Sequence, residues 1–257
     1  MLEARNLTKY YAAIPAIRDV SFSVPPGAVL GLLGPNGSGK STTVSILTGL
    51  LEPSGGGVFI DGVDIRECLL EYKARLGYVP EEAHLYNYLT GPEYLQFIGQ
   101  LRSLPDASLR RKIPAFLEIF GLTDDEHAPL SAYSKGMRQK ILISAALLHN
   151  PQLVIFDEPD SGLDVTSSLV LRSLVQALAA EGRMVLYSSH VLEIVEQVAT
   201  DVLILHDGRV AAHGSVTQLR DMMKLGSLEQ VFRRTLEETK VDDVDSVAGQ
   251  LVEAMKA

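Results

Sequence analysis

Nine residues near the N-terminus constrain the fold of this chain more than any other segment. They run from Gly34 to Thr42 as GPNGSGKST and match the phosphate-binding pattern GxxxxGK[ST]. The apolar run Ala28–Leu33 before them predicts a buried strand, and a helix is predicted after them from about Lys40 to Leu51. A strand, a glycine-rich turn and a helix in this order are the context that the pattern requires.

The residue types of this loop suit a phosphate group. The glycines let the backbone curl so that successive N–H groups point inward, and the following helix presents its positive end to the same anion. Lys40 adds a point charge at the β/γ position, and the hydroxyl of Ser41 is placed to bind Mg²⁺. A turn that binds nothing is the alternative, which the flanking strand and helix disfavour. The candidate phosphate-binding residues are Gly34, Pro35, Asn36, Gly37, Ser38, Gly39, Lys40, Ser41 and Thr42.

The rest of the chain predicts an α/β fold. Continuous apolar runs at Leu153–Phe156, Met184–Ser188 and Val202–His206 are typical of strands that are covered on both faces. Apolar residues recur at helical spacing from Leu171 to Leu178 and from Val191 to Val198. Alternating strands and helices favour a mainly parallel sheet.

Three other stretches depart from this alternation. Residues from about Phe22 to Ile65 carry extra short strands, among them Val58–Ile60, and residues from about Leu85 to Asn150 are predicted to be mostly helical. We interpret the helical stretch as an insertion between two core strands. The acidic segment Glu237–Asp245 indicates a solvated surface or a loose tail rather than a binding element.

Two acids follow the predicted strand Leu153–Phe156 directly. An acid at the end of a buried parallel strand emerges at the carboxyl edge of the sheet, where ligands bind in such folds. Asp157 can hold Mg²⁺ there, and Glu158 can polarise a water molecule toward a γ-phosphate. The alternative is a strand that ends in two surface acids before Pro159, which becomes improbable beside the phosphate-binding loop.

Composition excludes several classes of protein. The net charge of −9 argues against a nucleic-acid-binding surface. Cys68 is the single cysteine, so no disulfide can form within the chain. The start lacks a signal-peptide pattern, and no apolar run approaches the about 20 residues that a membrane span needs. We therefore expect a partner to supply any membrane part.

Further motifs narrow the class of nucleotide-binding protein. The segment Tyr133–Gln139 opens an apolar helix before the two acids, Ser161–Asp164 follows them, and Ser188–His190 ends the next strand. In these motifs and their order the sequence resembles the nucleotide-binding subunits of ABC transporters, from about Leu2 to Phe232. The resemblance implies an α/β phosphate-loop NTPase fold with a mainly parallel core sheet, an N-terminal antiparallel β subdomain and a helical insertion. It also implies an ATP-binding domain over residues 1–235, with the helical subdomain at about 85–150, and an acidic C-terminal tail over residues 236–257.

The resemblance also assigns roles to single residues. Tyr11 is similar to the aromatic residue that stacks on adenine, with Ile17 nearby and Tyr10 as the competing choice. The family signature corresponds to Ser134, Lys135, Gly136 and Met137, and it binds the γ-phosphate of an ATP held by the opposite subunit. Asp164 lies in the loop that touches the other subunit's site, and His190 is similar to the histidine that hydrogen-bonds the γ-phosphate.

The chain departs from the family pattern at two positions. Lys135 stands where the signature usually has the first of two glycines; the serine and the second glycine remain. Glu81, in the segment Gly77–Glu82, stands where the family has a glutamine that offers an oxygen to Mg²⁺ and to the attacking water. Because glutamate also offers an oxygen, we expect Glu81 to remain a metal ligand without the N–H donor.

The resemblance implies the ATPase subunit of an ABC transporter, which binds ATP and Mg²⁺. Two such chains are needed, because each ATP lies between the phosphate loop of one subunit and the signature of the other. A separate membrane permease would hold the chain at the cytoplasmic face of the membrane, and its coupling helix would dock beside Glu81–Leu89 and the helical insertion. The signature and Leu228–Phe232 resemble exporter ATPases of the ABC-2 type.

Other classes fit the sequence less well. A soluble ABC ATPase acting on DNA would carry a long coiled-coil insertion, and one acting on ribosomes would usually carry two cassettes in one chain. A non-hydrolysing regulator is disfavoured because Glu158 and His190 are both present. A GTPase is disfavoured because no NKxD motif for guanine occurs.

Overall fold

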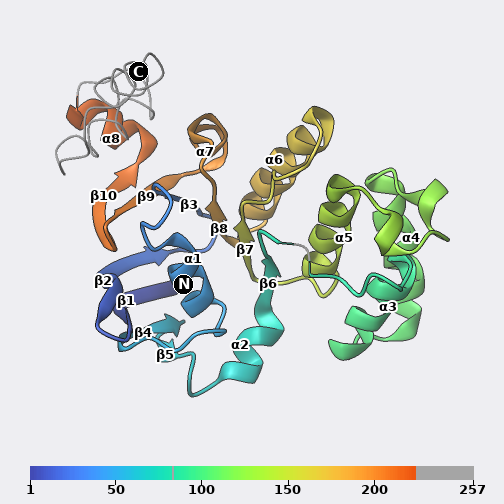
Figure 1. Cartoon of the computed structure of the whole chain (residues 1–257), viewed down its shortest axis with the longest axis horizontal. Helices are drawn as coiled ribbons and strands as arrows, with labels where there is room; N and C mark the ends of the chain where they lie inside the picture. The colour runs from blue at the N-terminus through green and yellow to red at the C-terminus, as the bar shows by residue number, and fades with distance from the viewer. Residues whose placement is uncertain (83, 224–257) are drawn as a thin grey trace, which may run out of the picture.

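Two β-sheets and a group of helices make up the part of the chain that the computed structural model describes, residues 1–82 and 84–223 (Figure 1). A four-stranded antiparallel sheet has the order β2-β1-β4-β5, and a six-stranded sheet has the order β10-β9-β3-β8-β7-β6. The first sheet consists of β1 (Leu2–Tyr11), β2 (Ile14–Val24), β4 (Gly55–Ile60) and β5 (Val63–Asp64). The second consists of β3 (Val29–Leu33), β6 (Leu76–Val79), β7 (Leu153–Asp157), β8 (Met184–Ser188), β9 (Asp201–His206) and β10 (Arg209–Ser215).

The helices fall into two groups. Three helices lie together on one side of the molecule, between β6 and β7 in the chain (Figure 1): α3 (Gly91–Leu101), α4 (Asp106–Ile119) and α5 (Lys135–Leu147). Short 3₁₀ turns at Thr123–Asp125 and Leu130–Ala132 separate α4 from α5. The remaining helices connect or follow the strands of the two sheets: α1 (Lys40–Leu47), α2 (Leu69–Arg75), α6 (Val165–Ala180), α7 (Leu192–Val198) and α8 (Val216–Met223).

The core sheet is mainly parallel, as its apolar strands predict. Strands β6, β7, β8, β3 and β9 pair in parallel, and among the described strands of this sheet only β10, at the edge, is antiparallel. Every residue of β3 is buried, and alternate side chains enter different clusters. Val29 and Leu33 pack in the cluster shared with α5, α6 and α7, whereas Leu30 and Leu32 pack with α1 and the first sheet. Burial on both faces explains the continuous apolar run.

The first sheet begins earlier than the sequence indicated. Its longest strands, β1 and β2, start at Leu2 and Ile14, although extra strands were expected only from about Phe22. The pairing register between them shifts after Ala4 and again after Leu7, and Asn6 has φ 50°. These irregularities break the alternation of buried and exposed residues that identifies a strand in a sequence.

Helix α1 is shorter than expected. It ends at Leu47 rather than near Leu51, because Thr48 caps it and Gly49 follows in a left-handed conformation with φ 66°. The predicted helical insertion is present as α3, α4 and α5. The segments Leu228–Phe232, Glu237–Asp245 and the expected tail at residues 236–257 lie outside the described residues.

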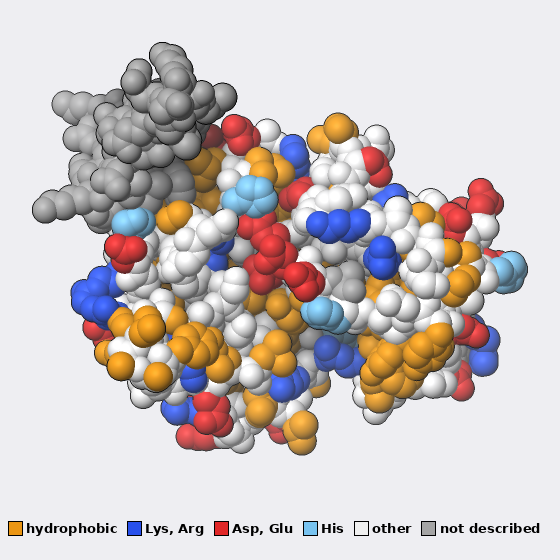
Figure 2. All heavy atoms as spheres, in the orientation of Figure 1, with side chains coloured by type: hydrophobic (Ala, Val, Ile, Leu, Met, Phe, Trp, Pro, Cys, Tyr) orange, Lys and Arg blue, Asp and Glu red, His pale blue; other side chains and the backbone are white. Residues whose placement is uncertain are grey.

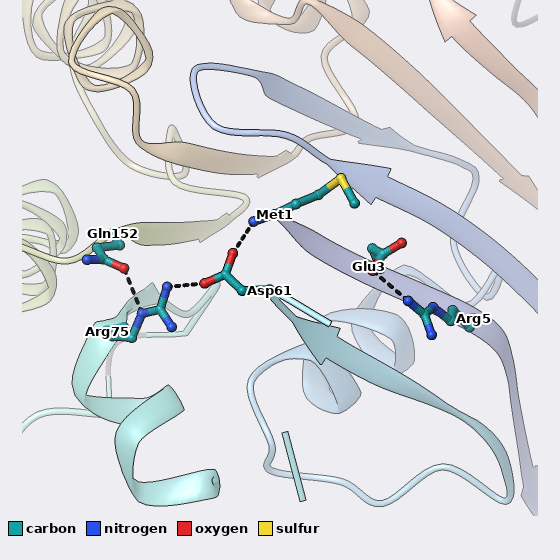
Figure 3. Close-up of polar contacts among 6 residues, drawn as sticks. All are labelled: Met1, Glu3, Arg5, Asp61, Arg75 and Gln152. Atoms are coloured by element: carbon teal, nitrogen blue, oxygen red, sulfur yellow. Dashed lines mark hydrogen bonds and ion pairs between the residues drawn. The ribbon is translucent and has the colours of Figure 1, made fainter. Parts of the chain in front are cut away.

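A polar network fastens the two sheets together at one corner (Figure 3). Arg75, the last residue of α2, donates from Nη2 to Asp61 Oδ2 at 2.6 Å and from Nε to Gln152 Oε1 at 2.6 Å. Asp61 turns the β4–β5 hairpin, and Gln152 precedes β7. The amino group of Met1 also donates to Asp61, and it is the main cause of the lowered pKa of that carboxyl, with Arg75 second. The contacts hold the first sheet against the start of β7, whose far end carries Asp157.

No helix within residues 1–82 and 84–223 combines the length and the hydropathy of a membrane-crossing segment.

We predict that Gly31→Ala destabilises the fold. Helix α7 crosses β3 at Gly31, and a Cβ there would lie 2.3 Å from Val195 Cγ1 and 3.2 Å from Ala199 Cβ. Overpacking of this kind typically lowers the free energy of unfolding by about 1–3 kcal/mol. Gly55→Ala is the matched control, since its Cβ would meet only Thr8 Cβ at 3.7 Å. Urea unfolding followed by circular dichroism measures both variants, and equal midpoints would contradict the prediction.

Candidate functional site

The glycine-rich loop joins β3 to α1, as its pattern predicts. Two of its glycines occupy places that no side chain could share. A Cβ on Gly34 would lie 2.4 Å from the carbonyl oxygen of Leu205, and a Cβ on Gly39 would lie 2.4 Å from Ile17 Cγ2. Gly39 also has φ 104°, which favours glycine. The close approach of β9 and β2 beneath the loop therefore requires glycine at both positions.

Lys40 begins α1 and folds back over the loop. Its Nζ donates to the carbonyl oxygens of Gly34 at 2.6 Å and Pro35 at 3.3 Å. Burial lowers the pKa of Lys40, whereas the charges of Glu158, Asp157 and Glu81 raise it. The ammonium group therefore sits among three acids from two other loops, with no side-chain acceptor bonded to it among the described residues.

These groups line a single pocket of about 400 Å³ at the carboxyl ends of the parallel strands. Figure 2 shows acidic side chains gathered near the middle of the same face, close to where β3, β7 and β8 end in Figure 1. The pocket draws on the loops after β3, β6, β7 and β8. Its lining residues are Leu33, Gly34, Pro35, Asn36, Lys40, Ser41, Glu81, Asp157, Glu158, Ser189, His190 and Leu192.

The two acids after β7 have different environments. Asp157 ends the strand and is only 6% exposed. Burial raises the pKa of Asp157, and the charges of Glu81 and Glu158 add to that shift, whereas the charge of Lys40 opposes it. Glu158 has φ 48°, and its N–H donates to the carbonyl oxygen of Ser188 at 3.0 Å. Both residues line the pocket, but Asp157 is buried whereas Glu158 is partly exposed.

His190 and Glu158 touch, although 31 residues separate them in the sequence. The Nδ1 atom of His190 lies 2.7 Å from Glu158 Oε2. The side chain of His190 is 73% exposed, whereas that of Glu158 is 13% exposed. The histidine therefore orients the glutamate on one side and presents its other ring edge to solvent at the mouth of the pocket.

The expected ligands of Mg²⁺ lie in this pocket, since Ser41, Glu81 and Asp157 all line it. Within residues 1–82 and 84–223, no three His, Cys, Asp or Glu side chains are arranged to enclose a metal ion by themselves. Mg²⁺ is usually bound through one or two carboxylates, water and substrate phosphates rather than by an all-protein cage. Two carboxylates and one hydroxyl, with the buried Asp157 among them, fit that mode of binding.

The signature residues lie at the start of α5 and do not line the pocket. Ser134 caps the helix by accepting a hydrogen bond from the N–H of Met137 at 3.2 Å. Lys135, which stands where the family has a glycine, donates from Nζ to Ser161 Oγ at 2.6 Å. A Cβ on Gly136 would lie 2.5 Å from the carbonyl oxygen of Gly162. The start of α5 therefore packs on the loop Ser161–Asp164 of the same chain.

Asp164 caps α6. Its carboxylate accepts hydrogen bonds from the N–H of Ser167 at 2.8 Å and from its hydroxyl at 2.6 Å. The bond from the hydroxyl is the main reason that the pKa of Asp164 falls to about 2. Lys140 Nζ lies 3.7 Å from Asp164 Oδ2. The side chain therefore has a structural role within its own chain.

Tyr11 ends β1 outside the pocket lining. It is 52% exposed and Tyr10 is 45% exposed, so either ring is open to a base. The Nζ of Lys9 lies 5.8 Å from the centre of the Tyr11 ring. The expectation that Ile17 packs near adenine is wrong, because Ile17 is fully buried beneath Gly39.

Sequence reasoning did not assign a site role to three residues of the pocket wall. Leu33 ends β3, Ser189 follows β8, and Leu192 begins α7. Ser189 also accepts a hydrogen bond from the N–H of Val191 at 3.1 Å, which shapes the turn that carries His190. Ser189 lies inside the motif Ser188–His190, and that position is the sequence signal from which its place in the pocket could be predicted.

Comparison with known proteins agrees with this arrangement. The family model described as ABC transporter matches residues 17–161. The ABC transporter ATP-binding protein NatA of Bacillus subtilis is 37% identical over 87% of this chain and 91% of its own length. The linearmycin resistance ATP-binding protein LnrL of the same organism is 37% identical over 85% of this chain and 70% of its own.

A solved structure described as the ATP binding subunit of an ABC transporter superposes with a TM-score of 0.86 at 34% identity. That superposition covers 92% of this chain and 99% of the other. The match extends over both sheets and the helical insertion, and the resemblance seen in the motifs is confirmed. The chain belongs to the ABC transporter family.

Proposed function

We propose that this chain is the ATP-hydrolysing subunit of an ABC transporter. The pocket at the carboxyl edge of the core sheet carries the proposal, because it joins a phosphate-binding loop to an acid pair and a histidine. Each of these groups comes from the end of a different strand. The pocket therefore depends on the fold as a whole and is more specific than any one motif.

The phosphates of ATP bind to the N–H groups of the loop and to Lys40, whose contacts with backbone oxygens give way to the anion. Ser41, Glu81 and Asp157 would hold Mg²⁺, which would supply positive charge to stabilise the phosphate oxygens. Tyr11 stacks on the adenine ring. The acids around Lys40 fit this role, since a divalent cation offsets their mutual repulsion.

Glu158 accepts the hydrogen bond of the attacking water and directs it toward the γ-phosphate. His190 holds the carboxylate of Glu158 through Nδ1 and has its exposed ring edge free to contact the γ-phosphate. The short contact between the two residues couples their proposed roles. Glu158 orients the water, and His190 orients Glu158 and contacts the γ-phosphate.

A second copy of the chain or a related subunit completes the site. The signature Ser134–Met137 does not line the phosphate pocket of its own chain, and it forms a helix N-terminus, which suits an anion bound to another subunit. Asp164 and its loop lie beside the signature and contact the opposite site. Residues 1–235 form the ATP-binding domain in this proposal, with residues 85–150 as its helical subdomain.

A groove beside the helical subdomain suits a separate permease, although its lining does not include the segment Glu81–Leu89 beside which the coupling helix was expected. Its volume is about 500 Å³, and it lies between the ends of α1, α2 and α3. Leu50, Leu70 and Leu101 line it and are 67%, 86% and 67% exposed. Lys73 and Arg102 add positive charge, so the groove fits an apolar helix that carries an acidic residue. Docking there holds the chain at the cytoplasmic face of the membrane.

Export is the direction of transport that we propose. The support is the form of the signature, with Lys135, and the similarity to a protein described by its role in linearmycin resistance. Resistance to a toxic compound agrees with outward transport. Copurification of the permease and transport in vesicles of defined orientation test this part.

We predict that Glu158→Gln binds ATP with unchanged affinity but hydrolyses it at least about a hundredfold more slowly, because the carboxylate that orients the water is lost. Two copies should then stay together around ATP, which gel filtration with and without nucleotide detects. Glu82→Gln is the matched control, since Glu82 is exposed and outside the pocket lining. Parent-like hydrolysis in Glu158→Gln would remove this residue from the mechanism.

We predict that Glu81→Gln retains ATP hydrolysis within about tenfold, because an oxygen ligand remains within reach of the metal. Glu81→Ala should lose considerably more activity and require more Mg²⁺, with ATP affinity less affected because Lys40 is intact. Steady-state assays with Mg²⁺ titrated compare the three proteins. If Glu81→Ala matches the parent in both rate and Mg²⁺ dependence, Glu81 is only a solvated acid.

We predict that Leu101→Ser abolishes copurification with the permease from detergent-solubilised membranes and leaves ATP binding unchanged. Leu101 lines the groove and is 67% exposed, so its loss removes apolar contact with the partner but little with the fold. Ile119→Ser is the matched control, since Ile119 is also 67% exposed but lies outside the groove lining. Equal recovery of the permease with both variants would place the interface elsewhere.

A further inference from the structure

Strand β8 and the turn after it contact the segment that follows β7 at three points. The N–H of Glu158 donates to the carbonyl oxygen of Ser188 at 3.0 Å, and the side chain of Glu158 meets His190 at 2.7 Å. One residue earlier on β8, the hydroxyl of Tyr187 donates to Asp160 Oδ2. Glu158 is thus held by β8 through its own backbone and through Asp160 two residues further on, and its side chain is held by His190, which follows β8.

The hydroxyl of Tyr187 is a rigid donor. The side chain is fully buried, and its ring lies 6.0 Å from that of Phe156, its register partner on β7. Burial is the main cause that raises the pKa of this phenol, and Asp160 is the second. The group therefore keeps its proton, and the packing of its ring determines where that proton points.

Glu158 needs such support. Its φ of 48° is a left-handed conformation that residues other than glycine seldom adopt, and that persists where the surroundings hold it. Asp160, two residues after Glu158, is well placed to hold this backbone conformation. Its carbonyl oxygen accepts from the N–H of Leu163 at 3.0 Å, and its Oδ1 is buried without a hydrogen-bond partner in the described part of the chain. Tyr187 is therefore the side-chain donor that ties down this carboxylate.

We propose that Tyr187 is a positioning residue for ATP hydrolysis: through Asp160 it holds the backbone of Glu158 so that the carboxylate of Glu158 faces the water. The inference rests on the proposed function of the pocket. Tyr187 touches neither the phosphates nor the water, and the pocket lining does not include it. Its effect reaches the reaction only through the orientation of Glu158.

Tyr72 provides a matched control for the loss of a buried hydroxyl. It is 1% exposed, and its hydroxyl donates to the carbonyl oxygen of Leu47 at 2.5 Å. Tyr187→Phe and Tyr72→Phe each remove one oxygen atom and one buried hydrogen bond. Only the first removes a contact to the segment that carries Glu158. A purely structural role for Tyr187 would make the two variants behave alike.

The kinetic test compares these variants at a temperature where circular dichroism shows every protein folded. Tyr187→Phe should lower kcat about tenfold, as expected for a displaced catalytic group, with KM for ATP within about twofold of the parent. Tyr72→Phe should keep the parent kcat. Asp160→Ala should lose as much as Tyr187→Phe, whereas Asp160→Asn keeps an oxygen acceptor and should restore kcat to within about threefold. A kcat for Tyr187→Phe equal to that of Tyr72→Phe would overturn the inference.

A double-variant comparison identifies the route of the effect. In a Glu158→Gln background the further change Tyr187→Phe should alter kcat little, because the group that it positions is already gone. A second loss of about tenfold in that background would show that Tyr187 acts otherwise.

Hydrogen exchange gives a readout that does not depend on turnover. The amide of Glu158 bonds to Ser188, so the segment 157–164 should exchange faster in Tyr187→Phe than in Tyr72→Phe. Equal exchange in the two variants would overturn the inference. A parent protein that binds but does not hydrolyse ATP would count against the proposed function, and the exchange comparison would still decide the role of Tyr187.

Discussion

One buried ammonium group organises the site. Lys40 lies at the start of α1. Burial lowers its pKa, and the charges of Glu158, Asp157 and Glu81 oppose that shift. Without the lysine, three acids would face one another across the pocket with no cation between them. Without the acids, a buried cation would stand alone. Lys40 offsets only part of the negative charge of the three acids before any ligand arrives, and the site can exchange its internal contacts for a phosphate and a divalent cation.

The core sheet determines which groups meet at that lysine. Register pairs place Asp157 on β7 opposite Ser188 on β8, and β8 lies directly beside β3, which leads into the phosphate loop. Because these strands are parallel, their carboxyl ends emerge at one edge. Gly31 lets α7 pack closely on β3, and α7 follows the turn that carries His190. The packing of α7 on β3 thus helps to determine where His190 lies in the pocket.

Local patterns in the sequence were sufficient to predict much of the fold. The loop Gly34–Thr42, the buried parallel strands and the helical insertion could be predicted, since each depends on glycine spacing or apolar periodicity over a short window. Strand β1 could not, because a bulge at Asn6 breaks its alternation. Helix α1 was predicted too long, because Gly49 lies in an apolar run whose periodicity continues past it.

The side-chain contacts of the site belong to the tertiary structure alone. Lys135 looked like a departure from a glycine pattern, and only the packing of α5 on the loop Ser161–Asp164 provides its partner, Ser161. Ile17 looked able to contact a base, but the fold buries it beneath Gly39. The sequence by itself determined which chemical groups stand at the ends of which strands. Only the tertiary structure decided which of them touch, because strand order and helix packing bring together residues that are far apart in the chain.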